Sequence, residues 1–274
     1  MNLPRLIISD LDGTLLPESK EITATTLDVL GELRSRGVTI ALATGKFLHL
    51  TRPYGEALGR QAPLIALDGA RTCLNGDETA HHNRCIPLDV AADLLVRYGE
   101  GATDLFLDNG QDELLMRFSS ENFPHLIRHW ASRTRAVQDA REHLEGDSAI
   151  IALYGPESEM RDVAEHARDD FPMLKVSFFA SELFGGGRVV FQPGGITKGT
   201  GVLDLCADLE IEPSETMVFG DWYNDIAMFQ AGCVNVAMAN AVDEVKALAH
   251  HVTEADSEAD GVARFLRGAF LNGA

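Results

Sequence analysis

Short apolar runs alternate with stretches of helical periodicity through the first third of the chain. Each apolar run is short enough for one strand and lacks the polar alternation of a half-exposed strand, which is typical of strands buried on both faces of a parallel sheet. Strands separated by helices predict right-handed crossovers and a doubly wound sheet. The expected strands cover residues 6–9, 38–43 and 63–67, and the expected helices run from the N-cap Thr23 to about Arg36 and over about 47–58.

The last third of the chain repeats this alternation. Its apolar runs predict strands over 216–219 and 234–238, and its periodic stretches predict helices over 225–231, 242–249 and 261–269. The two ends of the chain therefore have the pattern of one doubly wound domain.

The middle of the chain has a mixed pattern. Apolar and polar positions alternate near 105–107 and 114–116, and helical periodicity covers 88–98 and 158–169. We therefore predict an α/β protein of two domains. A Rossmann-like parallel-sheet core comprises 1–83 and 189–274, and a smaller α+β domain, 84–188, is inserted into it.

The net charge of the chain limits which classes of partner it can bind. Its 274 residues carry a formal net charge of −19. Such a chain repels polyanions, so we expect no nucleic acid partner. A small anionic substrate stays compatible with this charge, because a bound cation can invert the local field.

The chain shows no sign of a membrane or secreted protein. Its longest apolar runs, such as 38–43, are far shorter than a membrane span. The first residues, MNLPR, lead straight into the first predicted strand, so we expect no secretory leader. The four cysteines at 73, 85, 206 and 233 form no CxxC pair. We expect reduced thiols, a cytoplasmic protein and no membrane partner; monomer and homo-oligomer both stay open.

Carboxylates follow two of the predicted strands directly. Asp10 and Asp12 come after the first strand, and Asp221 and Asp225 come after the strand over 216–219. Ligands bind at this end of the strands in open α/β sheets. If the two strands are neighbours, the carboxylates converge, and like charges at close range need a cation. An oxygen-rich site of this kind suits Mg²⁺.

Complementary groups follow two other predicted elements. Thr44, Gly45 and Lys46 come after the strand over 38–43, and Lys198 lies at the expected start of a helix. A hydroxyl, glycine amides and an ammonium group are suited to holding a phosphoryl group. Together with the carboxylates, they indicate phosphoryl transfer through an aspartyl-phosphate.

The same residues carry a family resemblance. The sequence DLDGTLL at 10–16, Thr44, Lys198 and GDWYND at 220–225 resemble, in order, the four motifs of the haloacid dehalogenase superfamily. Four further segments are similar to its Cof-type phosphatases: FQPGGITKG at 191–199, NDIAMF at 224–229, VAMANA at 236–241 and DGVA at 260–263. The resemblance implies that the insert is the α/β cap that selects the substrate in this family.

The resemblance also implies a role for each motif residue. Asp10 would be the nucleophile and Asp12 the general acid and base. Asp10, the backbone carbonyl of Asp12 and Asp221 would bind Mg²⁺. The phosphoryl group would be held by Thr44, Gly45, Lys198 and Asn224, while Asp225 would support Lys198 or a metal-bound water. The implied activity is Mg²⁺-dependent hydrolysis of a small phosphorylated metabolite, a sugar phosphate foremost.

Two positions depart from the family pattern. Lys46 stands where arginine is usual, and Lys cannot make the bidentate contact of a guanidinium. Asp68 stands where asparagine is usual and adds a negative charge that could repel phosphate, pair with Lys46 or point away.

Other interpretations stay open. A phosphosugar mutase shares the aspartyl-phosphate step, and a non-catalytic protein could bind phosphate and metal on the same scaffold. His81 and His82, near Cys73 and Cys85, could suggest a zinc site, but their spacing fits no common ligand pattern, so we expect solvated loop residues there.

Overall fold

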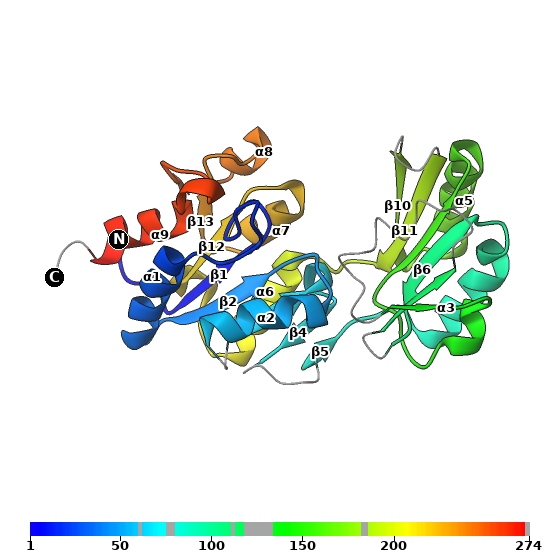
Figure 1. Ribbon diagram of the computed structural model, residues 1–274, viewed down its shortest axis with the longest axis horizontal. Coiled ribbons are helices and arrows are strands. Elements are labelled where there is room, and N and C mark those ends of the chain that lie inside the picture. Colours follow the sequence, from blue (N-terminus) through cyan, green and yellow to red (C-terminus); the bar gives the residue numbers. More distant parts are fainter. Residues whose placement is uncertain (60–61, 75–79, 111–112, 118–133, 182–185, 272–274) are drawn as a thin grey trace. The chain divides into compact units, whose positions relative to one another are not determined.

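The structure is a computed structural model that describes residues 1–59, 62–74, 80–110, 113–117, 134–181 and 186–271 (Figure 1). The chain divides into two compact units. The first comprises 1–83 and 196–274, and the second comprises 84–195.

The first unit contains a sheet whose order is β14-β13-β12-β1-β2-β3-β4-β5. Pairing is parallel from β14 through β3 and antiparallel from β3 through β5. This confirms the α/β fold with a parallel core sheet, to which the antiparallel β4 and β5 add an unpredicted edge. The strands are β1 (Leu6–Ser9), β2 (Thr39–Ala43), β3 (Leu64–Ala66), β4 (Arg71–Cys73), β5 (His82–Asn83), β12 (Thr216–Gly220), β13 (Val234–Ala237) and β14 (His251–Val252).

Helices pack on both faces of this sheet. Adjacent residues of a strand point to opposite faces, so the side chains of Leu64 and Ile65 in β3 lie on opposite faces of the sheet. A Cβ atom at Gly55 in α2 would lie 2.8 Å from the Leu64 side chain, whereas one at Gly201 in α6 would lie 2.5 Å from Ile65. The helices are α1 (Ala24–Ser35), α2 (Leu48–Leu58), α6 (Lys198–Asp208), α7 (Ile226–Phe229), α8 (Asp243–Lys246) and α9 (Gly261–Leu266).

Capping side chains set where two of these helices begin. Thr23 accepts a hydrogen bond from the Thr26 backbone N–H and caps α1, as predicted. At α6, Thr197 accepts from the Thr200 N–H while the Thr200 hydroxyl accepts from the Thr197 N–H, which is a reciprocal capping box. Lys198 is therefore the first residue of α6.

The second unit is a six-stranded sheet of order β10-β11-β9-β6-β7-β8. Within the described residues, all its strand pairs are antiparallel except β7 with β8, and α5 packs on β10 and β11. Its elements are α3 (Leu88–Leu94), β6 (Asp104–Asp108), β7 (Leu114–Arg117), β8 (Thr134–Ala136), β9 (Ile151–Gly155), α5 (Glu157–Asp170), β10 (Leu174–Ser181) and β11 (Gly186–Pro193).

The second unit ends later along the chain than our predicted boundary at 188. Strand β11 pairs with β10 as far as Pro193, so residues 189–193 belong to the second sheet, and 194–195 also lie in the second unit instead of the core. The apolar run in β11 resembles a core strand in sequence, and only its pairing shows which sheet it joins.

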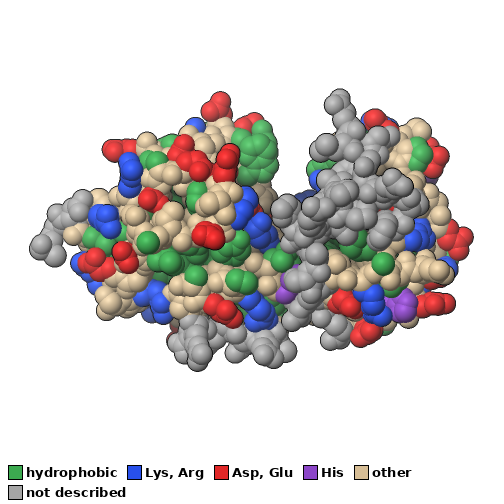
Figure 2. All heavy atoms as spheres, viewed as in Figure 1, with side chains coloured by type: hydrophobic (Ala, Val, Ile, Leu, Met, Phe, Trp, Pro, Cys, Tyr) green, Lys and Arg blue, Asp and Glu red, His purple; other side chains and the backbone are tan. Residues whose placement is uncertain are grey.

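Two surface properties bear on the expected partners. Among the described residues, no helix combines the length and apolar character that crossing a membrane requires. On the face drawn in Figure 2, acidic and basic side chains are interspersed, although the chain as a whole carries a formal charge of −19.

Candidate active site

Strands β1 and β12 are parallel neighbours in the core sheet. Leu6 pairs with Thr216 and Ser9 with Phe219, and the Asp10 N–H donates to the Phe219 carbonyl over 3.0 Å. Asp10 and Asp221 therefore both lie at the carboxyl end of the parallel strands. This is the adjacency on which the predicted convergence of carboxylates depends.

A buried ammonium group joins two of these carboxylates. The Nζ of Lys198 donates to Oδ1 of Asp10 and to Oδ1 of Asp225, each over 2.7 Å. The side chains of Lys198 and Asp225 are fully buried, and that of Asp10 is 8% exposed. Water screens such a pair poorly, so the contacts hold Asp10 and Lys198 in fixed positions.

Asp225 also organises the loop after β12. Its Oδ2 accepts hydrogen bonds from the backbone N–H groups of Asp221 and Trp222, over 2.8 and 3.0 Å. Since its Oδ1 is bonded to Lys198, both oxygens of Asp225 have partners within the protein. This arrangement suits the supporting position that we predicted for Asp225.

Asp221 lies against the loop that follows β1. The Thr14 hydroxyl donates to its Oδ1 over 2.7 Å. Gly13 has a φ of +80°, and a Cβ atom there would lie 2.4 Å from Oδ2 of Asp221. Glycine at 13 thus permits both the left-handed backbone and the close approach of the carboxylate.

Burial and mutual repulsion disfavour the charged forms of two of these acids. Burial, with the nearby charges of Asp225 and Asp221, outweighs the opposing effect of Lys198 and raises the pKa of Asp10 to about 8. Burial also raises the pKa of Asp221 to about 6. Lys198 alone therefore does not balance the negative charge of these carboxylates, and a bound cation would supply further positive charge.

The donor set fits a hard divalent metal. One carboxylate oxygen from each of Asp10, Asp221 and Asp225 lies within 4.8 Å of the others. Oxygen donors of this kind suit Mg²⁺ better than softer metals. Because the oxygens of Asp225 already have protein partners, Asp10 and Asp221 are the better placed ligands.

Asp12 lies outside this buried cluster. Its Oδ1 is 2.8 Å from the Nζ of Lys20, its Oδ2 is 2.5 Å from the Nζ of Lys46, and its side chain is 40% exposed. Partial burial tends to raise the pKa of Asp12, but the hydrogen bonds from Lys20 and Lys46 outweigh it and hold the pKa below its usual value.

The predicted phosphate-binding residues lie at neighbouring strand ends. Thr44 is buried after β2, and its hydroxyl accepts from the Lys46 N–H over 3.2 Å. A Cβ atom at Gly45 would lie 3.4 Å from both carboxylate oxygens of Asp68. Asn224, predicted to donate to phosphate, donates through Nδ2 to Oδ1 of Asp68 over 2.9 Å. Of the alternatives for Asp68, pairing with Lys46 is not realised, because the ammonium of Lys46 contacts Asp12 instead.

Sequence reasoning missed two residues of the site. Thr14 lies within the first motif, so its contact with Asp221 could have been suspected from its place in that motif. No motif in the sequence could have indicated Lys20. Its contact with Asp12 depends on the path of the intervening loop and on its own φ of +60°.

The chain is similar to known phosphatases and to a solved structure over nearly its whole length. The 5-amino-6-(5-phospho-D-ribitylamino)uracil phosphatase YitU of Bacillus subtilis is 28% identical over 282 residues, covering 97% of this chain and 98% of its own. A phosphoglycolate phosphatase of Methanopyrus kandleri is 26% identical over 271 residues, covering 96% and 95%. A crystal structure of a Thermotoga maritima protein aligns with a TM-score of 0.85 at 26% identity, over 97% of each chain.

A family model extends over nearly the whole sequence. It describes haloacid dehalogenase-like hydrolases and matches residues 7–266, which include all the candidate site residues. The chain therefore belongs to the haloacid dehalogenase-like hydrolases.

Proposed function

We propose that this chain is a Mg²⁺-dependent phosphatase that hydrolyses a sugar phosphate or a similar polyol phosphate through an aspartyl-phosphate on Asp10. That it is a phosphatase of the haloacid dehalogenase type, acting on small phosphorylated metabolites, accords with its family and relatives. Support for a phosphorylated polyol comes from the Bacillus relative, whose name specifies a phospho-D-ribityl group.

The observation that carries the proposal is the double hydrogen bond of the buried Lys198. Its contacts with Asp10 and Asp225 keep an ammonium group beside the proposed nucleophile without relying on solvent. A phosphate ester that approaches Asp10 must overcome repulsion between anions. Lys198 reduces this repulsion and is positioned before the substrate arrives, which lowers the cost of reorganisation.

In the first step, an oxygen of Asp10 attacks phosphorus and the bond from phosphorus to the ester oxygen breaks. Oδ1 of Asp10 accepts from Lys198, and Oδ2 makes no hydrogen bond to another described residue. Asp10 and Asp221, with the backbone carbonyl of Asp12, would hold Mg²⁺, which supplies charge neutralisation when bound. The leaving alkoxide takes a proton from Asp12 and departs as the alcohol.

In the second step, Asp12 takes a proton from water, and the hydroxide attacks phosphorus and releases Asp10 and inorganic phosphate. The contacts with Lys20 and Lys46 keep Asp12 ionised, which is the form this step needs. For the first step, the phosphate of the substrate competes for Lys46, so the pKa of Asp12 rises and the carboxyl can carry a proton.

Phosphate release across a panel of sugar, polyol and aromatic phosphates, with Mg²⁺ and with EDTA, tests this proposal. We expect release that requires Mg²⁺ and proceeds without any added sugar acceptor, with sugar or polyol phosphates preferred. Phosphate transfer that needs an acceptor would indicate a mutase instead. A folded protein that binds Mg²⁺ and phosphate but hydrolyses no ester would indicate a binding protein.

A further inference from the structure

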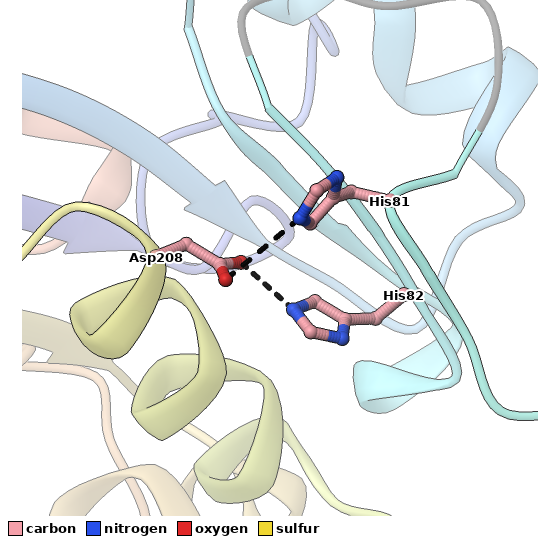
Figure 3. A group of neighbouring side chains, drawn as sticks. All are labelled: His81, His82 and Asp208. Atoms are coloured by element: carbon pink, nitrogen blue, oxygen red, sulfur yellow. Dashed lines mark hydrogen bonds and ion pairs between the residues drawn. The ribbon is translucent and has the colours of Figure 1, made fainter.

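Two adjacent histidines, His81 and the first residue of β5, His82, converge with a carboxylate from a helix in the first unit (Figure 3). The Nε2 of His82 lies 2.8 Å from Oδ2 of Asp208, and the Nε2 of His81 lies 3.8 Å from Oδ1. These residues are separate from the carboxylate cluster of the active site. Figure 3 shows both imidazole rings directed at the same carboxylate.

The donor atoms of the two histidines and Asp208 lie close together. His82 is the first residue of β5 and His81 precedes the strand, so strand alternation does not direct the two rings to opposite faces. One donor atom from each ring and one from Asp208 lie within 4.8 Å of one another. His81 is half exposed and His82 and Asp208 are partly buried, so a solvated ion can reach the group.

Asp208 stands where a negative charge is unfavourable. It is the last residue of α6, and the C-terminal end of a helix carries a partial negative charge. Across the described ranges, no lysine or arginine lies within ion-pair distance of Asp208. A bound cation would therefore be favoured beside this carboxylate.

We propose that His81, His82 and Asp208 bind a divalent transition metal, Zn²⁺ foremost, at a site separate from the catalytic one. Zn–N distances of about 2.0–2.1 Å place tetrahedral ligand atoms about 3.3 Å apart. The separations of 2.8 and 3.8 Å lie on either side of this value, so small side-chain rotations would complete the geometry. Water or another ligand would take the fourth position.

The donor types separate this site from the active site. Imidazole nitrogen favours zinc, copper and nickel, whereas all-carboxylate sites favour Mg²⁺. The spacing of the two histidines matched no common zinc pattern in sequence because the third ligand lies 126 positions away. Neither Cys73, which is fully buried, nor Cys85 joins the cluster. The bound metal would link the edge strand β5 to the end of α6.

Isothermal titration with Zn²⁺ at pH 7.5, in excess Mg²⁺ to occupy the catalytic site, tests this proposal. We expect one Zn²⁺ per chain, and Co²⁺ should give the visible absorption of a tetrahedral site. His82→Ala and Asp208→Asn should each weaken Zn²⁺ binding at least about tenfold, since loss of outer-shell partners alone costs about 10–100-fold.

Two control variants make the result specific. His166→Ala removes an exposed histidine of the second unit and should leave Zn²⁺ binding unchanged. Asp10→Asn alters the catalytic carboxylates and should also retain it, so the outcome is independent of the proposed phosphatase mechanism. The proposal is overturned if the protein does not bind Zn²⁺ or if Mg²⁺ displaces all of the bound Zn²⁺. It is also overturned if folded His82→Ala and Asp208→Asn proteins bind Zn²⁺ as tightly as the unaltered protein does. Circular dichroism establishes that each variant is folded.

Discussion

Oδ1 of Asp68 accepts a hydrogen bond from the side-chain amide of Asn224, 2.9 Å away. Asp68 has left-handed backbone angles, with φ 53° and ψ 34°, and its N–H donates to the Thr44 carbonyl over 3.1 Å. Its carboxylate also lies against Gly45. An acid therefore contacts two residues that we propose bind phosphate.

We predict that Asp68→Asn tightens phosphate binding several-fold. Asparagine has the same shape and tolerates the left-handed backbone, so the change removes the charge with little strain. One charge removed near a bound anion is worth about 1 kcal/mol or more, which is roughly a fivefold change. Competitive inhibition by inorganic phosphate measures it. Asp28→Asn, the same change on the exposed face of α1, should have no effect, and equal inhibition constants in both variants would contradict the prediction.

We predict that Asp10→Asn abolishes turnover while the fold persists. Loss of a nucleophile costs on the order of 10³-fold or more in kcat. Because burial raises the pKa of Asp10 to about 8, its charged form is unfavourable, and Tm should stay the same or rise. Steady-state kinetics and thermal melting above pH 8 test this. Turnover within tenfold of the unaltered protein would exclude Asp10 as nucleophile.

We predict that Lys198→Met destabilises the protein by about 3–5 kcal/mol near pH 8. The variant leaves the buried Asp10 and Asp225 without their shared cation, and breaking a buried pair costs this much. Urea unfolding measures the loss. Lys175→Met removes an exposed lysine and should change stability by less than about 0.5 kcal/mol. If the two variants unfold at the same urea concentration, the ion pairs of Lys198 do not stabilise the fold.

We predict that Mg²⁺ affinity falls as the pH is lowered. The pKa of Asp10 is raised to about 8 and that of Asp221 to about 6, so below these values the metal must displace a proton. Affinity should fall about tenfold per pH unit between pH 8 and 6, and more steeply below, when a second proton is displaced. Calorimetry between pH 5.5 and 8.5 tests this.

The Asp10→Asn variant is the control for this pH dependence. It removes the group that titrates near pH 8, so its Mg²⁺ affinity should no longer fall about tenfold per pH unit between pH 8 and 6. If the variant still shows this fall, a group other than Asp10 causes it.

Much of the core was predictable because short buried strands have a strong signal. The strands over 6–9 and 216–219 were predicted at their observed places, and their pairing brings Asp10 and Asp221 together. The helices near 225–231 and 242–249 were predicted too long: only Ile226–Phe229 and Asp243–Lys246 are α-helical, since turns and a 3₁₀ segment occupy the rest.

Contacts of long polar side chains were not predictable. Asp12 was predicted as the general acid and base, and its pairing with Lys20 and Lys46 depends on loop conformation, for which the sequence has no periodic signal. The same holds for Asn224 and Asp68, which are 156 positions apart. Residue types in a motif indicate the chemistry, whereas the partner of each group depends on the folded backbone.

The pairing of β1 with β12 also governs when the site can exist during synthesis. Leu6 pairs with Thr216, and next to them Arg5 contacts Glu215. Arg5 and Glu215 are 210 positions apart along the chain. At roughly 5–20 residues per second, the ribosome needs about 10–40 s to make the intervening chain. During that interval, one edge of β1 has no β12 beside it, and Asp10 has no Asp221 near it. The proposed metal ligands Asp10 and Asp221 can thus come together only after the whole second unit has been made.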